Sequence, residues 1–209
     1  MPEKDEKESL LKDLADALAN DEKIPLRNAN LVFGEGAADS DICFVGEAPG
    51  FYEDKEGRPF VGRAGKLLDK LISDVGLKRK DVYITNIVKR RPPGNRDPLP
   101  DEIAAFAPYL SKQIEIIDPK VIVPLGRFAM NYFLPTAKIS KDQGKLFWWG
   151  KKLIIPTYHP AAALRSTTVM EELERNFKKI PAAVRKYEMF VADRGGAISE
   201  PQSAQKSLF

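Results

Sequence analysis

Cysteine is almost absent from this chain, since Cys43 is the only one among 209 residues. A single cysteine excludes a disulfide within the chain and any metal or iron–sulfur site built from cysteines alone. A chain without disulfides is typical of a reducing compartment. We therefore expect an intracellular protein, located in the cytoplasm or nucleoid.

Long apolar runs are also missing. No stretch approaches the roughly 18 to 20 consecutive apolar residues that cross a bilayer as a helix. The first ten residues, MPEKDEKESL, lack the apolar centre of a signal peptide. The sequence thus predicts a soluble protein with neither a membrane segment nor an export signal.

Neither sign of charge dominates, because 33 Lys and Arg stand against 30 Asp and Glu, a formal net charge of +3. So small an excess permits nucleic-acid binding without demanding it. Hydrophobic residues make up 43% and charged residues 30%, which is ordinary for a globular α/β domain. We predict a monomer with one domain over residues 1–192. Residues 193–209 are rich in glycine, serine and glutamine, which predicts a disordered tail.

Hydrophobic patterning alternates between strand and helix along the chain. Helical patterns occur over residues 6–19, 62–76 and 100–118. Five β-like runs are present, at 31–33, 42–46, 82–88, 120–126 and 152–158. This alternation predicts a three-layer α/β/α fold, with helices on both faces of a central, mainly parallel sheet of four or five strands.

Three polar segments directly follow predicted strands. The first is GEAPG at 46–50, which continues into the glycine-rich loop 51–65. The second is TN at 85–86, which runs into KRRPPGNR at 89–96, and the third is YHPAAALR at 158–165. Because ligands of such folds bind at the carboxyl ends of the strands, we predict that these segments form the functional site.

Three side chains in these segments are candidates for ligand contacts. His159, the only histidine, precedes Pro160, which favours an extended backbone that aims the ring off the strand end. Its imidazole can donate a hydrogen bond to an oxygen that gains negative charge. The Asn86 amide offers a paired donor and acceptor to the edge of a base, and Phe60 offers a surface on which a base stacks. A core histidine, a turn-capping amide and a phenylalanine plug are the structural alternatives.

Glycines and basic residues surround these candidates. Gly62 begins a predicted helix, whose N-terminus is able to hold a phosphate. Lys89, Arg90, Arg91 and Arg96 form a basic cluster. Such a cluster is usually a solvated loop, whereas beside a base pocket it becomes a phosphate clamp.

Taken together, four ordered motifs resemble those of the family 4 uracil-DNA glycosylases, within the uracil-DNA glycosylase superfamily. The motifs are GEAPGxxED, GRPFVGRAG, TNIVKRRPPGNRxP and YHPAAALR, and the similarity covers about residues 30–179. The resemblance implies the fold of that superfamily. It also implies an enzyme that flips uracil out of DNA and hydrolyses the bond between base and sugar. Uracil-containing DNA is then the partner, and the abasic product enters base excision repair.

The resemblance also assigns roles to individual residues. Glu47 occupies the position of a carboxylate that orients water or stabilises the cationic sugar. Phe60 matches the residue that stacks on uracil, Asn86 the one that reads the edge of uracil, and His159 the one that contacts O2. Glu53 matches a residue that closes the pocket near C5 and thereby rejects the methyl group of thymine. Glu47, Asn86 and His159 are the expected catalytic residues.

Further contacts follow from the same motifs. The uracil pocket is expected to include two more residues of the first motif, Gly46 and Ala48. The HPAAALR segment resembles one that enters the duplex where the base has left, which makes Leu164 the candidate wedge. The residues expected to contact DNA are Gly62, Arg63, Lys89, Arg91, Arg96, Leu164 and Arg165.

The chain departs from the family in one respect. Family 4 members typically hold a [4Fe–4S] cluster with four cysteines: a pair before the first strand, one in a KCRPP motif and one in the following helix. Here Arg90 stands in the KCRPP position, Phe106 in the helical position, and residues 20–26 contain no cysteine. We therefore expect no cluster, no other metal and no cofactor, with Phe106 and Ile24 packing in its place. The loss puts the geometry of the 89–96 loop in doubt.

Three rival interpretations remain. A related subgroup traps DNA covalently through a histidine in an insertion after the TN strand, and this chain has neither feature. A catalytically weak DNA-binding relative is disfavoured by the retained Glu47, Asn86 and His159. A broader base specificity is disfavoured by Glu47, which stands in place of an asparagine.

The last five residues, QKSLF, suggest one further partner. Gln205, Leu208 and Phe209 resemble a shortened form of a sliding-clamp-binding motif. The alternative is a tail that merely ends in Leu-Phe.

Overall fold

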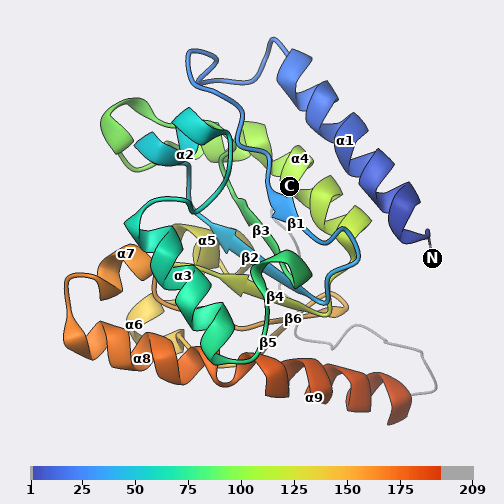
Figure 1. Cartoon of the computed structure of the whole chain (residues 1–209), viewed down its shortest axis with the longest axis vertical. Helices are drawn as coiled ribbons and strands as arrows, with labels where there is room; N and C mark the ends of the chain where they lie inside the picture. The colour runs from blue at the N-terminus through green and yellow to red at the C-terminus, as the bar shows by residue number, and fades with distance from the viewer. Residues whose placement is uncertain (1, 194–209) are drawn as a thin grey trace.

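The computed structural model, which describes residues 2–193, has a six-stranded sheet at its centre (Figure 1). The strands are β1 (Glu35–Gly36), β2 (Ile42–Gly46), β3 (Tyr83–Asn86), β4 (Val121–Pro124), β5 (Phe147–Trp149) and β6 (Lys152–Ile154). They lie in the order β1-β3-β2-β4-β6-β5. The four inner strands run parallel, whereas β1 and β5 pair antiparallel at the two edges.

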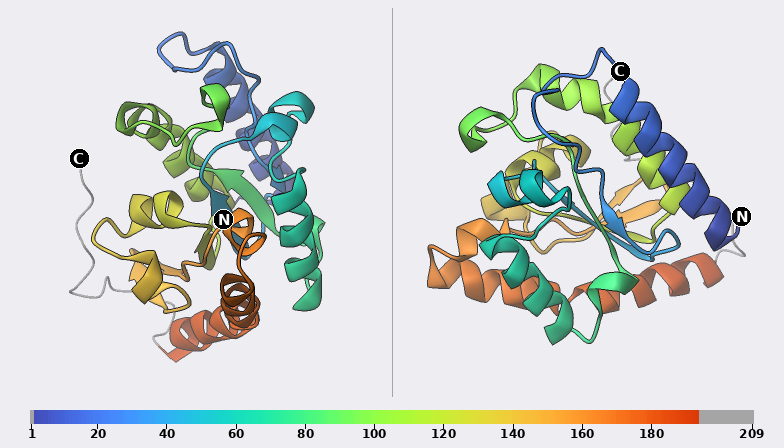
Figure 2. Two further views of the ribbon diagram at one scale, coloured as in Figure 1. Left: turned by 90° about the vertical axis from the view of Figure 1, so that its left-hand side faces the viewer. Right: turned by 45° about the horizontal axis from the view of Figure 1, so that its top comes forward.

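Helices cover both faces of this sheet. They are α1 (Lys4–Asn20), α2 (Phe51–Glu56), α3 (Arg63–Asp74), α4 (Pro100–Ile117), α5 (Arg127–Phe133), α6 (Ile139–Asp142), α7 (Pro160–Ala163), α8 (Thr167–Phe177) and α9 (Ile180–Asp193). Short 3₁₀ segments are η1 (Arg79–Asp81) and η2 (Pro93–Asn95). One apolar core lies beneath α1, α4 and α5, and a second lies beneath α3, α8 and α9. The right-hand view of Figure 2 shows α1 and α4 opposite α3, α8 and α9, so the predicted three-layer fold is confirmed.

The inner strands are apolar because both of their faces are buried. Every residue of β2, β3 and β4 is buried, as is typical of parallel strands between two helix layers. Cys43 and Val45 of β2 join the core beneath α1 and α4. Ile42 and Phe44 point to the other face, and Phe44 stacks on Phe177 of α8 with ring centroids 5.6 Å apart.

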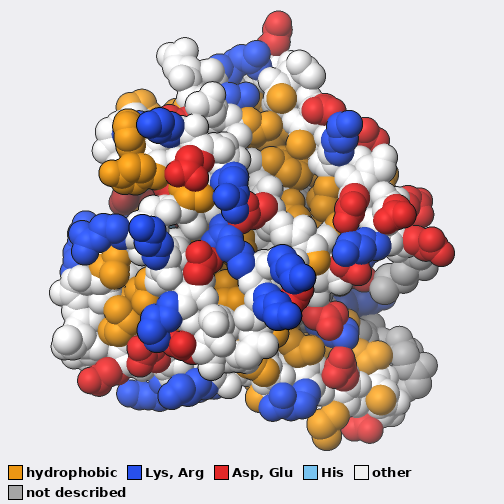
Figure 3. Space-filling view, viewed as in Figure 1, with side chains coloured by type: hydrophobic (Ala, Val, Ile, Leu, Met, Phe, Trp, Pro, Cys, Tyr) orange, Lys and Arg blue, Asp and Glu red, His pale blue; other side chains and the backbone are white. Residues whose placement is uncertain are grey.

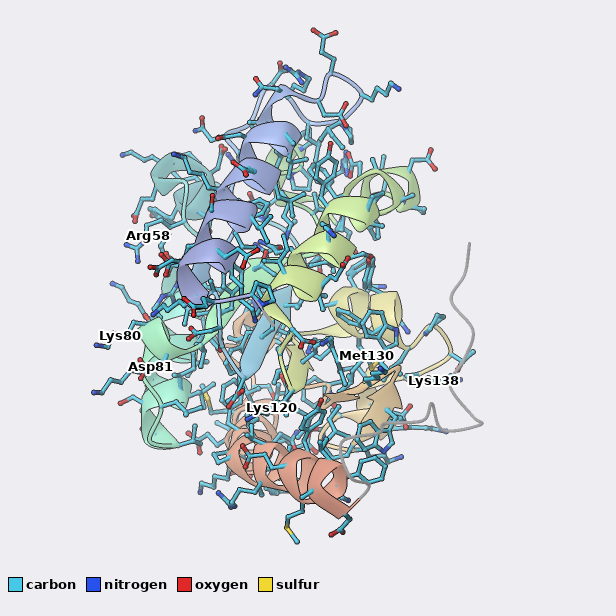
Figure 4. The ribbon with its side chains drawn as sticks, turned by 90° about the vertical axis from the view of Figure 1, so that its right-hand side faces the viewer. Arg58, Lys80, Asp81, Lys120, Met130 and Lys138 are labelled. Carbon is cyan, nitrogen blue, oxygen red and sulfur yellow. The ribbon has the colours of Figure 1, made fainter. Side chains whose placement is uncertain are left out.

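Charged residues join the layers at the amino end of the sheet. Lys120, immediately before β4, donates from Nζ to Asp41 (2.9 Å) and to Glu188 of α9 (2.7 Å). Figure 4 shows Lys120 between the sheet and α9. Both carboxylates are about half exposed, so each pair contributes only about 0 to 1 kcal/mol. The layers are therefore held mainly by their apolar cores.

The predicted strand at 31–33 is wrong. The Val32 N–H donates to a carbonyl of the loop after β3, 2.8 Å away. The Phe33 carbonyl accepts from the side chains of Thr85 and Gln113, at 2.8 and 3.1 Å. Because these backbone groups bond to side chains and to the loop after β3 instead of to the backbone of a strand, pairing with β3 begins only at β1.

Other predicted boundaries need smaller corrections. The strands β3, β4 and β6 are present but shorter than their apolar runs. The edge strands β1 and β5 bring the sheet to six strands instead of four or five. The helices α1, α3 and α4 match the predicted patterns. Helix α9 ends at Asp193, and the rest of the predicted tail lies outside the described residues.

Within residues 2–193, no helix combines the length and apolar character needed to cross a membrane.

The parallel register brings the polar segments to one edge. Gly46, the last residue of β2, pairs with Asn86, the last residue of β3. Beyond β4 and β6, Leu125 and Thr157 form one more parallel bridge. The chain therefore leaves β6 at the edge where β2 and β3 also end, and His159 follows there.

Lys89 is a core residue rather than a DNA contact, which corrects the prediction that it binds a phosphate. Its side chain is fully buried, and Nζ donates to Thr85 Oγ1 and Gln113 Oε1, each at 2.5 Å. Nζ also lies 5.7 Å from the centre of the Phe33 ring. Burial lowers the pKa of Lys89 to about 7.

We expect this buried amine to make stability depend on pH. An unfolded lysine titrates near pH 10.4, so between about pH 7 and 10 the unfolded chain binds more protons than the folded chain. The free energy of unfolding should therefore gain up to about 1.4 kcal/mol per pH unit from Lys89. Denaturant unfolding of the wild type and Lys89→Met measures this slope, which the substitution should remove.

The slope is best measured between about pH 7 and 8.5. Above this range Cys43 begins to oppose it, because burial raises the pKa of the folded thiol to about 12. Lys112→Met, at an exposed position of α4, is the matched control and should keep the wild-type slope. Equal slopes for the wild type and Lys89→Met would contradict the prediction.

Candidate active site

A cavity of about 510 Å³ lies where the three polar segments meet at the carboxyl edge of the sheet. The predicted site residues in its wall are Glu47, Ala48, Glu53, Phe60, Asn86, Arg96, His159 and Arg165. The wall also includes Pro49, Gly50, Ala64, Pro92, Asn95, Asp97 and Ala161. The structure thus brings together residues that are more than 100 positions apart in the chain, as expected of segments that follow parallel strands.

Gly46 gives the buried side chains beside it room to meet. A Cβ at this position would lie 2.3 Å from Asn86 Oδ1 and 2.6 Å from the Phe60 ring. Asn86 is only 2% exposed, so its amide has little freedom to move aside. Any side chain at Gly46 would displace the amide or the ring.

Phe60 is presented by a strained loop. Its φ of +52° lies in the left-handed region, which is rare for phenylalanine. Arg79 holds the loop by donating to the carbonyls of Pro59 (2.6 Å) and Phe60 (3.2 Å). Gly65 permits the turn, because a Cβ there would lie 1.9 Å from the Phe60 carbonyl oxygen. The Phe60 ring faces His159 with ring centroids 5.6 Å apart, and such strain is typical of functional sites.

The Glu53 carboxylate fastens the same loop from α2. Oε1 accepts from the backbone N–H of Val61 (3.0 Å) and Gly62 (2.9 Å). These two N–H groups precede α3 and have no partner within the helix. Glu53 therefore orders the Phe60 loop in addition to lining the cavity. The predicted phosphate contact of Gly62 needs correction, because Glu53 already uses that N–H. Arg63, the exposed first residue of α3, remains available to DNA.

His159 is a neutral hydrogen-bond donor. Nδ1 accepts from the backbone N–H of Ala161 at 3.1 Å, which leaves the ring hydrogen on Nε2. Burial lowers the pKa of His159 to about 4, against the opposing effect of Glu53. Gly126 leaves space for the histidine, since a Cβ there would lie 3.0 Å from His159 Cβ. The imidazole is therefore uncharged at neutral pH.

Glu47 titrates far above an ordinary carboxyl group. Burial, and to a lesser degree the negative charge of Asp97, raises the pKa of Glu47 to about 7, while Arg127 opposes the shift. Arg127 and Asp97 form an ion pair, with Nη2 and Oδ2 2.6 Å apart. Sequence reasoning missed both residues. The available signals were an acidic residue directly after the basic loop and an arginine directly after the apolar run 120–126.

The predicted basic clamp is partly neutralised within the protein. Arg91 donates from Nε to Asn95 Oδ1 at 2.6 Å. Arg96 pairs with both carboxylate oxygens of Glu102 on α4, at 2.8 and 2.6 Å. Arg165 is exposed and lines the cavity, and among residues 2–193 it forms no ion pair. The three arginines nevertheless lie at or near the mouth of the cavity.

Leu164 stands at the surface immediately after α7. Its side chain is 38% exposed, and its neighbour Arg165 lines the cavity. Apolar side chains in such positions act as wedges between bases in proteins that distort duplex DNA. The position is compatible with the predicted role.

The residues near the predicted iron–sulfur position do not fit a cluster, which requires thiolate ligands. Arg90 is buried and donates from Nη1 to the Ala29 carbonyl at 2.5 Å. Phe106 and Ile24 are buried in one apolar core, as the sequence predicts. Cys43 lies within β2, and burial raises the pKa of its thiol to about 12. Within residues 2–193, no three His, Cys, Asp or Glu side chains are grouped to hold a metal ion.

Known proteins share most of this chain. Residues 33–185 match the uracil DNA glycosylase superfamily. A type-4 uracil-DNA glycosylase of Sulfurisphaera tokodaii is 53% identical over 161 residues, which cover 72% of this chain and 73% of the relative. A type-4 uracil-DNA glycosylase of Saccharolobus solfataricus is 50% identical over 74% of this chain and 76% of the relative. One of Thermotoga maritima is 50% identical over 72% of this chain and 83% of the relative. The resemblance of the sequence motifs is thereby confirmed, and the chain belongs to the uracil DNA glycosylase superfamily, among its type-4 members.

Proposed function

We propose that this protein removes uracil from DNA by hydrolysing the N-glycosidic bond, leaving an abasic site for base excision repair. The observation that carries the proposal is one cavity that combines a stacking ring, a buried amide, a neutral imidazole and a carboxyl group of raised pKa. These are Phe60, Asn86, His159 and Glu47. The type-4 relatives are named for this activity.

The charge that develops on the departing uracil explains the hydrogen-bond donors of His159 and Asn86. Breaking the bond gives an anionic uracil, whose charge falls largely on its carbonyl oxygens. The His159 Nε2–H donates to O2 as this charge develops, and Asn86 pairs with the edge of the base. Stacking on Phe60, worth about 1 to 3 kcal/mol, helps to offset the cost of unstacking the base from DNA.

The charge that develops on the sugar explains the role of the Glu47 carboxylate. As the base leaves, the sugar becomes an oxocarbenium-like cation, which a nearby negative charge stabilises. Ionised Glu47 supplies that charge or orients the attacking water. Because its pKa is about 7, about half of the enzyme carries the ionised form at neutral pH.

Base selection falls to Glu53. Its carboxylate lines the cavity and is held by two backbone N–H groups, so it resists displacement by a larger base. We propose that it rejects the methyl group of thymine at C5. DNA phosphates then contact Arg63, Arg91 and Arg165, while Leu164 fills the space left by the flipped base.

We also propose that the enzyme works without an iron–sulfur cluster or any other cofactor. The reaction needs only donors and a carboxylate. The resemblance implies cysteines at positions 90 and 106 and within residues 20–26, and the buried Arg90, Phe106 and Ile24 stand there instead. Iron and sulfide analysis of the purified protein tests this, and stoichiometric iron would overturn it.

The remaining assignments concern the setting in which the enzyme works. We propose an intracellular monomer, because one chain supplies every wall of the cavity and a single cysteine suits a reducing compartment. A sliding-clamp contact through Gln205, Leu208 and Phe209 belongs to the same proposal, and these residues lie outside the described part of the chain. Binding assays with and without residues 205–209 test that contact.

The first test removes the donors from the cavity. His159→Ala should lower single-turnover uracil release by about 100- to 1000-fold, as loss of an oxyanion donor does. Asn86→Ala should lower it by at least about tenfold, because hydrogen bonds to the base are lost. Release from a uracil-containing oligonucleotide is followed as abasic sites that break under alkali.

Asn20→Ala, at the exposed end of α1, is the matched control and should retain the wild-type rate. Thermal unfolding of Asn86→Ala checks that the buried site still folds. Full activity in both cavity variants would show that the site lies elsewhere. No release by the wild type across a range of salt and temperature would refute the enzymatic proposal itself.

The second test uses pH. If ionised Glu47 is required, kcat/KM should rise as pH increases through about 7 and then level off, because His159 is already neutral over this range. Glu47→Gln should lower the rate and abolish the inflection. Asp97→Asn removes a negative charge that raises the pKa of Glu47, so it should move the inflection to lower pH. An unchanged inflection in Glu47→Gln would assign the titration to another group.

A further inference from the structure

Two large aromatic side chains are exposed beside the cavity. Phe51 is 53% exposed and Tyr52 is 59% exposed, both in the first turn of α2. Their rings meet edge to face, with centroids 5.4 Å apart. Figure 3 shows hydrophobic side chains at the surface in the upper left, over α2 and the loop before α4, with a Lys or Arg side chain beside them. The proposed uracil chemistry makes no use of this pair.

The aromatic pair is continuous with the cavity wall. Gly50, which precedes the pair, and Glu53, which follows it, both line the cavity. The Tyr52 ring also packs over Gly62, where an added Cβ would lie 3.6 Å from Tyr52 Cδ2. The two rings therefore stand at the rim, directly outside the space proposed for the flipped base.

A cation accompanies the rings. The guanidinium carbon of Arg91 lies 5.1 Å from the centre of the Phe51 ring, within the range of a cation–π contact. Its nearest carboxylate, on Asp54, is 3.9 Å away, so this ion pair is weak. Arg91 can therefore approach a phosphate, while the exposed parts of the two rings, about half of each side chain, remain open to bases. This combination of ring faces and a cation is how proteins hold single-stranded nucleic acid.

We propose that Phe51, Tyr52 and Arg91 form a platform that stacks an unpaired base next to the flipped uracil, so that single-stranded DNA is the preferred substrate. The inference rests on the proposed function, because it takes the cavity as the uracil site. A duplex serves the platform poorly, since each neighbouring base is already stacked and paired. In a single strand these faces are free to stack on the protein.

The test is a binding cycle in a His159→Ala background, which keeps the uracil attached. A single-stranded oligonucleotide with one uracil is compared with versions in which the base on either side is replaced by an abasic tetrahydrofuran. Removing the stacked neighbour should weaken binding by about fivefold or more. The double variant Phe51→Ala/Tyr52→Ala should bind the intact strand more weakly by a similar factor. It should also lose its sensitivity to the missing base.

Two further variants separate stacking from a purely structural effect. Phe51→Trp/Tyr52→Phe keeps both ring faces and should bind like the parent protein. Met189→Ala, at a 67% exposed position on α9, removes an exposed apolar side chain elsewhere and should also bind normally. Equal affinity of the parent and the double alanine variant for the single strand would overturn the platform. An equal loss on single-stranded and duplex DNA would overturn the preference for single strands.

The outcomes also separate this inference from the proposed function. Failure of the wild type to release uracil, together with base-dependent binding on the platform, would refute the enzymatic proposal alone. Normal uracil release with no dependence on Phe51 and Tyr52 would refute the platform alone. Protein binding to these rings without any effect on DNA affinity would assign the surface to a protein partner and contradict the inference.

Discussion

The site depends on the absence of a side chain at Gly46. The parallel register sets this residue against Asn86 where β2 and β3 end, and a Cβ there would overlap both the Asn86 amide and the Phe60 ring. Phe60 in turn stacks against His159, for which Gly126 leaves space. Two residues without side chains at the carboxyl ends of strands thus allow an amide, a phenyl ring and an imidazole to meet. The strands beneath are buried on both faces, so the sheet fixes Gly46 and Asn86, and the loops at its edge bring Phe60 and His159 to them.

Burial shifts the pKa values of His159 and Glu47, two titratable groups of the cavity wall, in opposite directions, and each shift favours the uncharged form. The pKa of His159 falls to about 4, whereas the pKa of Glu47 rises to about 7. A neutral imidazole suits an uncharged uracil in the ground state and still donates to O2 as the anion forms. The carboxyl group is poised near neutrality because Asp97 and Arg127 act on it with opposite signs. The site therefore accepts a neutral base and stabilises charge only as the bond breaks.

The sequence predicted the fold class from local patterns. It predicted part of the cavity wall from the polar segments that follow strands, and the resemblance to a known family added residues such as Glu47 and Glu53. Apolar periodicity defines α1, α3 and α4, and motifs that follow strands must meet at one edge of a parallel sheet. Residues 31–33 look like a strand, but side chains distant in sequence take their backbone groups. Lys89 looks like a surface lysine, and its burial depends on Thr85 and on Gln113, 24 residues away in the chain. Asp97 and Arg127 reach Glu47 only through tertiary structure. Residues that meet only in the folded structure leave no periodic pattern in the sequence.

The loop at 89–96 is positioned by hydrogen bonds to other parts of the chain. Its first two residues face inward: the Lys89 carbonyl accepts from the Val32 N–H at 2.8 Å, and Arg90 donates to the Ala29 carbonyl at 2.5 Å. Each such bond contributes only about 1 kcal/mol, but both join the loop to the segment that precedes β1. Although the first two residues of the loop are buried, its later residues still lie in the cavity wall. Inward-facing lysine and arginine therefore hold the start of the loop whose later residues line this edge of the site.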